Sequence, residues 1–126
     1  IVADPEAQKI IKLIDVLWLQ GNRGVAAAFE VEHTTSIYSG LLRMSDLLTL
    51  QPNISFPLYI VTSNDRLSKV RRELARPTFQ AIELHETCGF FSYETLMQEK
   101  ESIMRWANSP DAIKRLAEYV PTVLDQ

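Results

Sequence analysis

The stretch Ile14-Asp15-Val16-Leu17-Trp18-Leu19, followed after a turn by Ala26-Ala27-Ala28-Phe29-Glu30-Val31-Glu32, decides how this chain folds. The segment from Lys9 to Leu19 is apolar on both alternating faces, a pattern typical of a strand buried on both sides. Residues 20–24 (Gln-Gly-Asn-Arg-Gly) are a turn signal, and residues 25–32 then return as a second strand. The sequence therefore predicts a β-hairpin.

Three carboxylates interrupt these apolar runs: Asp15, Glu30 and Glu32. An ionised carboxylate that is buried without a partner costs more free energy than a folded domain can spare. The three must therefore hold protons, basic partners or a metal ion. Because side chains alternate across a sheet, Glu30 and Glu32 share one face. Closure of the turn places Asp15 opposite Ala28, Phe29 or Glu30, and Asp15 shares that face if its partner is Ala28 or Glu30.

The chemistry of these carboxylates leaves two main alternatives. Facing Cβ atoms on paired strands lie about 5 Å apart, close enough for one ion to bridge. Hard cations such as Mg²⁺ prefer oxygen ligands, and the carbonyl of Val31 could complete such a site. Alternatively, Glu30 and Glu32 lie at a solvated sheet edge or pair with Arg23, Arg43 or Lys12. The apolar residues before Glu30 argue against a solvated edge, so a metal site and pairing with Arg43 both stay open.

The rest of the chain alternates between helical and strand patterns. A helix is expected over about 36–50, a strand over 56–62 and a helix over 66–76, which Pro77 ends. Residues 78–91 are expected to contain a short strand near Phe79–Leu84 and another near Phe90. Helical periodicity follows over 92–108 and again over 110–119. This order predicts an α/β fold with a mixed sheet and flanking helices, in one domain over residues 1–126.

Composition narrows the class of protein. The chain has 126 residues, of which 46% are hydrophobic, enough to build the core of one domain. A formal net charge of −3 differs from the basic character of dedicated nucleic-acid binders, so contact with nucleic acid would need a local basic patch. Cys88 is the single cysteine, which excludes an internal disulfide and fits a reducing, cytoplasmic setting.

No apolar run reaches the length of about 20 residues that spans a bilayer, and no signal-peptide pattern is present. Because the chain begins at Ile1 rather than Met, we expect it to be a fragment of a longer protein.

Several other residues are secondary candidates. One side of the predicted helix over 66–76 carries four cations that could contact phosphates, although a solvated helix face is the commoner arrangement; they are Arg66, Lys69, Arg72 and Arg76. Arg43 could pair with a carboxylate of the hairpin, bridge to Asp46 on its own helix or contact a scissile phosphate. Tyr38 lies off the main apolar stripe and is expected to pack in the core, although it could instead reach the site. His33 is expected to point away from the carboxylates. His85 and Cys88 have no partner visible in the sequence.

The two strands of the hairpin resemble the metal-binding hairpin of the PD-(D/E)xK nucleases. In that superfamily the Asp ends one strand, and the (D/E)xK triplet lies on the next. The run from Phe29 to Leu47 is also similar to a group of bacterial proteins in that superfamily often described as restriction-endonuclease-like, as are Pro57–Val61 and Arg76–Phe79. The resemblance covers residues 10–80.

The resemblance implies a restriction-endonuclease-like fold and Mg²⁺- or Mn²⁺-dependent hydrolysis of DNA phosphodiester bonds, of restriction or defence type. Asp15 and Glu30 would be the metal ligands, and Arg43 an auxiliary cation. Glu32 occupies the place usually held by Lys, and it could accept a proton from the attacking water or bind a second ion. The alternatives are a catalytically inactive nuclease-like module that binds nucleic acid or protein, and an interaction domain whose carboxylates only pair with arginines.

The family core also has a helix and a strand before the Asp-bearing strand, for which this chain has little room. We therefore expect either that these elements are missing or that a second subunit completes the sheet of a homodimer, with DNA as the other partner.

Overall fold

A computed structural model of the chain describes residues 5, 16–19, 25–31, 37–51, 53, 56–105 and 110–122. Asp15, Glu32 and His33 lie outside these residues. Predictions about the hairpin turn and about the first part of the strand over 9–19 lie outside them as well.

A four-stranded sheet in the order β1-β2-β3-β4 is the centre of the fold. The strands are β1 (Val16–Leu19), β2 (Val25–Val31), β3 (Leu58–Thr62) and β4 (Cys88–Ser92). β1 pairs with β2 in antiparallel fashion, whereas β2, β3 and β4 are parallel. The predictions of an antiparallel hairpin and of a mixed sheet are both confirmed.

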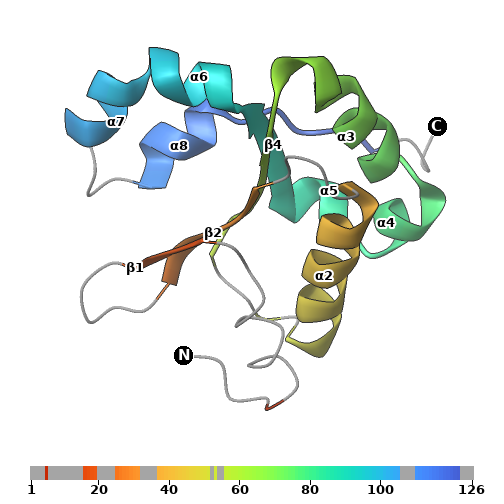
Figure 1. Cartoon of the computed structure of the whole chain (residues 1–126). Coiled ribbons are helices and arrows are strands. Elements are labelled where there is room, and N and C mark those ends of the chain that lie inside the picture. The colour runs from red at the N-terminus through yellow and green to blue at the C-terminus, as the bar shows by residue number, and fades with distance from the viewer. Residues whose placement is uncertain are drawn as a thin grey trace.

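Helices cover both faces of this sheet (Figure 1). α2 (Ile37–Leu50) links β2 to β3, and the connection from β3 to β4 contains the 3₁₀-helix η2 (Asn64–Arg66), α3 (Leu67–Leu74), α4 (Pro77–Ala81) and α5 (Leu84–Thr87). The chain then continues through α6 (Tyr93–Gln98), α7 (Lys100–Arg105) and α8 (Pro110–Leu116). None of the helices in the described part of the chain is long and apolar enough to cross a lipid bilayer.

Strand alternation divides the core into two layers. On one face, α2 through α5 pack over the side chains of Ala28, Leu58, Ile60, Cys88 and Phe90. On the other face, residues of α6 and α8 pack over Ala27, Tyr59, Val61 and Phe91. Rings stack across three neighbouring strands on this second face, with centroids 5.4 Å apart for Phe29–Tyr59 and 5.4 Å apart for Tyr59–Phe91. Every residue of β3 and β4 is buried; the apolar run over 56–62 predicted this for β3.

One element of the prediction is wrong. Residues 79–84 form the end of α4 and the start of α5 rather than a strand. α3 already ends at Leu74, and Pro77 lies in the first turn of α4, where its fixed φ suits a helix, so Pro77 starts a second helix. The helix expected over 92–108 is divided between α6 and α7 at Glu99, and its last residues are outside the described ranges.

The segment after α8 returns to the sheet beside β4. Phe90 and Glu118 exchange two backbone hydrogen bonds of 3.0 and 2.8 Å and form an isolated antiparallel bridge. Gly89 lies under this segment: a Cβ added there would come 2.8 Å from Cζ of Tyr119 and 2.9 Å from Cβ of Ala117. The absence of a side chain at residue 89 is therefore what lets the returning segment close over the strand.

We expect Gly89→Ala to lower the free energy of unfolding by about 1–3 kcal/mol, because the added methyl group overpacks this contact. Urea denaturation of the two proteins measures the loss. In a Tyr119→Ala background the same substitution should cost less, because two of the three nearest atoms, Cζ and the hydroxyl oxygen of Tyr119, have been removed. Equal costs in both backgrounds would show that the contact with Tyr119 is not the cause.

Candidate active site around Glu30

Glu30 is a carboxylate in the interior of the sheet. It points to the same face as Ala28, toward the layer of α2 and α3, and its side chain is only 1% exposed. Its neighbour in register on β3 is Ile60, whose own neighbour on β4 is Phe90. The run Ala26–Ala28 before it is equally buried, as the sequence indicated. The solvated-edge alternative is therefore wrong for Glu30.

Arg43 is the partner of this carboxylate. Its Nη1 donates a hydrogen bond of 2.7 Å to Oε2 of Glu30, and the pair forms a salt bridge. Arg43 lies off the apolar stripe of α2, which consists of Ile37, Leu41, Met44 and Leu47. Its side chain is 30% exposed. Of the roles that the sequence left open for Arg43, pairing with a hairpin carboxylate is the one observed.

The register of the hairpin is described from Val16 onward. Val16 pairs with Phe29 and Leu17 with Ala28. Asp15 lies outside the described residues, so its expected place opposite Ala28, Phe29 or Glu30 stays a prediction. Within the described ranges no group of three or more His, Cys, Asp or Glu side chains could hold a metal ion. Because Asp15 and Glu32 are outside those ranges, the predicted trio stays a prediction.

Two buried hydroxyl residues lie at the carboxyl ends of the parallel strands, close to the site. Thr62 and Ser92 end β3 and β4, pair in register and are fully buried. By alternation they share the face of Ile60, Phe90 and therefore Glu30. Ser92 caps α6: its Oγ accepts a 3.0 Å bond from the backbone N–H of Thr95. The sequence analysis missed this pair, although a polar residue ending each apolar run was the available signal.

The four cations of the predicted stripe differ in their exposure and in their partners. Lys69 and Arg72 are exposed, whereas Arg66 is half-buried. Arg76 is exposed but bonded to Glu73, and its guanidinium lies 4.9 Å above the ring of Tyr38. The hydrogen bond from Arg76 to Glu73, together with the charge of that carboxylate, raises the pKa of Arg76.

Arg71, which the sequence analysis did not single out, donates a 3.0 Å bond to Oε1 of Glu118 and lies over the Phe90 ring. Arg71 and Arg76 therefore each bind a carboxylate and an aromatic ring of the protein, whereas Lys69 and Arg72 are exposed on α3, where they could contact an external anion.

The residues that lacked a visible partner in the sequence acquire one in the fold. His85 is buried, and its Nε2 lies 2.8 Å from Oγ1 of Thr122. Cys88 is also buried, with its Sγ 3.7 Å from Sδ of Met44. Burial, followed by the nearby charge of Glu30, raises the pKa of the Cys88 thiol. The thiol therefore stays protonated and is a poor nucleophile. Tyr38 contacts Phe79 of α4 with ring centroids 5.8 Å apart and lies under Arg76, but it is 37% exposed, so the expectation that it packs in the core is wrong.

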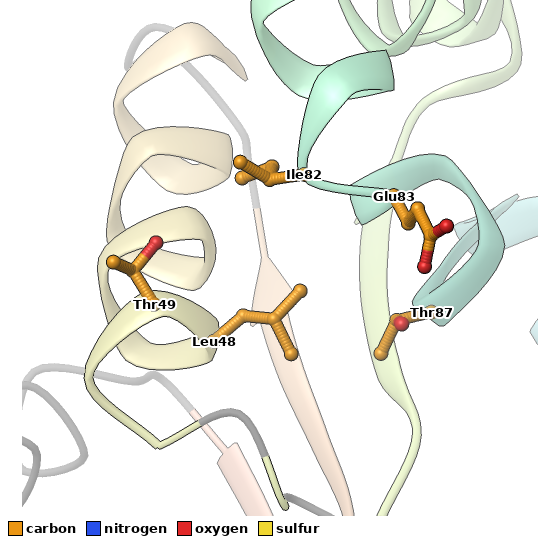
Figure 2. Close-up of a pocket in the computed structure, with 5 residues that line it drawn as sticks. All are labelled: Leu48, Thr49, Ile82, Glu83 and Thr87. Atoms are coloured by element: carbon orange, nitrogen blue, oxygen red, sulfur yellow. The ribbon is translucent and has the colours of Figure 1, made fainter.

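A hollow of about 390 Å³ lies at the end of the sheet opposite the carboxyl ends of β3 and β4. Figure 2 shows Leu48 and Thr49 of α2 on one side of it, and Ile82, Glu83 and Thr87 on the other. Thr87 directly precedes β4, so this hollow is at the amino ends of the strands, away from Thr62 and Ser92. Its lining offers one carboxylate and two hydroxyls among apolar side chains, and it is separate from the Glu30–Arg43 pair.

Comparisons with known proteins find similarity to a Type II restriction enzyme. The family model described as the Type II restriction enzyme NmeDI C-terminal domain matches residues 1–120. The Type II restriction enzyme NmeDI of Neisseria meningitidis serogroup C is 32% identical over 71 residues, which are 56% of this chain. The match spans 20% of the length of that relative. No solved structure matches the chain.

Proposed function

Because the chain belongs to the family of the Type II restriction enzyme NmeDI C-terminal domain, we propose that it is the nuclease domain of a restriction-type enzyme that hydrolyses DNA phosphodiester bonds. The observation that carries this proposal is the buried Glu30 on the second strand of the hairpin. Burying a carboxylate beside the apolar core costs stability, and a catalytic site is a reason to retain one.

The proposed fold is that of the PD-(D/E)xK nucleases, with DNA as the partner and a homodimer as the assembly. The hairpin followed by a helix and a parallel strand supports this assignment, since β1, β2, α2 and β3 occur in that order. We propose that residues 1–126 act as one such domain.

The chemistry of the carboxylate fits a hard divalent cation. Glu30 supplies a buried oxygen donor, the kind that Mg²⁺ and Mn²⁺ accept. We propose Asp15 and Glu30 as the ligands of one such ion, with Glu32, two positions after Glu30 in the sequence, as a further carboxylate of the site. The bound ion would supply a water of lowered pKa and stabilise the charge that develops on the leaving oxygen.

We also propose roles for Glu32, for Arg43 and for the cations of α3. Glu32, in the place of the usual Lys, accepts a proton from the attacking water or binds a second ion. Arg43 supplies the positive charge that a Glu cannot provide, and its forked guanidinium suits a phosphate. The exposed Lys69 and Arg72 of α3 contact phosphates further along the DNA backbone, with Arg66 and Arg76 flanking them.

A second candidate is a catalytically inactive nuclease-like module that binds nucleic acid or protein. The observation that favours it is the Glu30–Arg43 salt bridge, which neutralises the carboxylate without a metal ion. In that case Glu32 marks the loss of catalysis.

Calorimetry with Mn²⁺ on the full chain separates the two. The nuclease proposal expects Mn²⁺ binding by the wild-type protein that is lost in Glu30→Gln and in Asp15→Asn, together with cleavage of DNA. Absence of Mn²⁺ binding, combined with a DNA mobility shift that needs no metal, would establish the inactive module instead.

The exposed cations of α3 make a prediction about DNA affinity. Replacing Lys69 and Arg72 together by Ala should weaken binding of a short duplex uniformly across sequences. Since each phosphate contact contributes about 0.9 to the salt slope, the slope of log affinity against log salt concentration should shrink by about 2. Fluorescence anisotropy without divalent ions measures it.

The double variant Lys114→Ala/Arg115→Ala is the charge-matched control, because both residues are exposed on α8, in the layer on the other face of the sheet. Equal slopes for the two double variants would remove α3 from the DNA interface.

A further inference from the structure

The two side chains of the Glu30–Arg43 salt bridge differ in how deeply they are buried. Glu30 sits on a central strand with 1% of its side chain exposed, whereas Arg43 comes from a covering helix and keeps 30% exposure. The carboxylate is therefore held in place by the sheet. The arginine side chain is long and already 30% exposed, so moving it out of the contact exposes less buried surface than moving Glu30 would.

The negative charge of the buried Glu30 carboxylate must be compensated by a cation. Arg43 Nη1 occupies the Oε2 atom at 2.7 Å, and a divalent ion would use oxygen atoms of the same carboxylate. With one formal charge on each partner, the salt bridge is neutral. Removing the arginine without a replacement would take a cation away from a buried carboxylate, which is unfavourable. A divalent ion removes that penalty because it compensates the same charge.

We propose that Arg43 acts as a latch on Glu30: its guanidinium holds the carboxylate in the metal-free protein and releases it when a divalent cation binds. This inference rests on the proposed function, since it assumes that Glu30 is a metal ligand. A phosphate of DNA offers the released guanidinium a second acceptor that suits its fork. DNA and metal ion then favour each other's binding, because each takes one member of the pair, and such coupling is reciprocal.

Mn²⁺ titration without DNA tests the latch. Arg43→Gln removes the competing cation and should bind Mn²⁺ about tenfold more tightly than the wild-type protein, a factor typical of coupling between sites. Arg43→Lys should lie between the two, because an ammonium on a shorter side chain keeps the charge but lacks the fork. Arg71→Gln is the matched control: it makes the same change of charge at an exposed arginine bonded to Glu118, and its Mn²⁺ affinity should equal that of the wild-type protein.

A second readout follows the wild-type protein itself and uses Arg43→Lys only to assign the signal. In the wild-type protein labelled with ¹⁵N, the arginine Nε–Hε signal that is missing from Arg43→Lys should move during titration with Mg²⁺. The signal of Arg71 should stay in place.

The possible outcomes separate the latch from the function beneath it. If the wild-type protein binds Mn²⁺ and Arg43→Gln binds it no more tightly, or the Arg43 signal does not move, the latch is refuted and the metal site stands. If neither the wild-type protein nor any Arg43 variant binds Mn²⁺, the proposed function fails, and the latch fails with it.

Discussion

Glu30→Gln is expected to reduce Mg²⁺-dependent cleavage of DNA by at least about 10²–10³-fold, the loss typical when one strong electrostatic contact to the reacting groups is removed. Gln keeps the shape of the side chain but has no negative charge for the ion, so the substitution removes the ligand and leaves the strand intact. Cleavage of plasmid DNA by equal concentrations of the two proteins measures the change.

A matched control separates this effect from a general effect of charge. Glu86→Gln makes the same change at an exposed carboxylate on α5. Because α5 lies at the amino end of β4, away from Thr62 and Ser92, this variant should cut DNA at the wild-type rate. Circular dichroism checks that both variants are folded. A Glu30→Gln protein that cuts as fast as Glu86→Gln would remove Glu30 from the catalytic site.

Arg43→Ala is expected to lower the free energy of unfolding by about 2–4 kcal/mol. Removing one member of a buried ion pair leaves the other charged and buried, which typically costs about 3–5 kcal/mol; the partial exposure of Arg43 reduces this cost. Urea denaturation at neutral pH, in the presence of a chelator, measures it.

The double variant Glu30→Gln/Arg43→Ala provides the cycle that isolates the pair. With the carboxylate already neutral, the loss of Arg43 should cost about 1 kcal/mol or less, close to the value of an ordinary hydrogen bond. If Arg43→Ala costs the same in both backgrounds, the salt bridge contributes nothing to stability, and the side chain acts only through its apolar contacts.

Local pattern was sufficient for most elements of the fold. The apolar run over 26–29 placed β2 and argued against a solvated edge for Glu30, and the stripe of Ile37, Leu41 and Met44 defined α2. The same reasoning failed at Phe79–Leu84. A short apolar run carries too few residues to distinguish a period of 2 from one of 3.6, and the decisive residue was Pro77 in the first turn of α4.

For the candidate site, too, the sequence predicted some features and the tertiary structure decided others. The residue types and their spacing were enough to single out Glu30, to place it on one face of a hairpin and to require that its charge be compensated. The choice of Arg43 over other basic side chains depended on how α2 packs on the sheet, because the two residues are 13 positions apart and lie on different elements. The contacts of His85 with Thr122 and of Arg71 with Glu118 arise likewise from the return of the chain end to β4. Strand and helix periodicity are set by neighbours within a few residues, whereas the partner of a buried charge is set by packing between elements that are distant in the sequence.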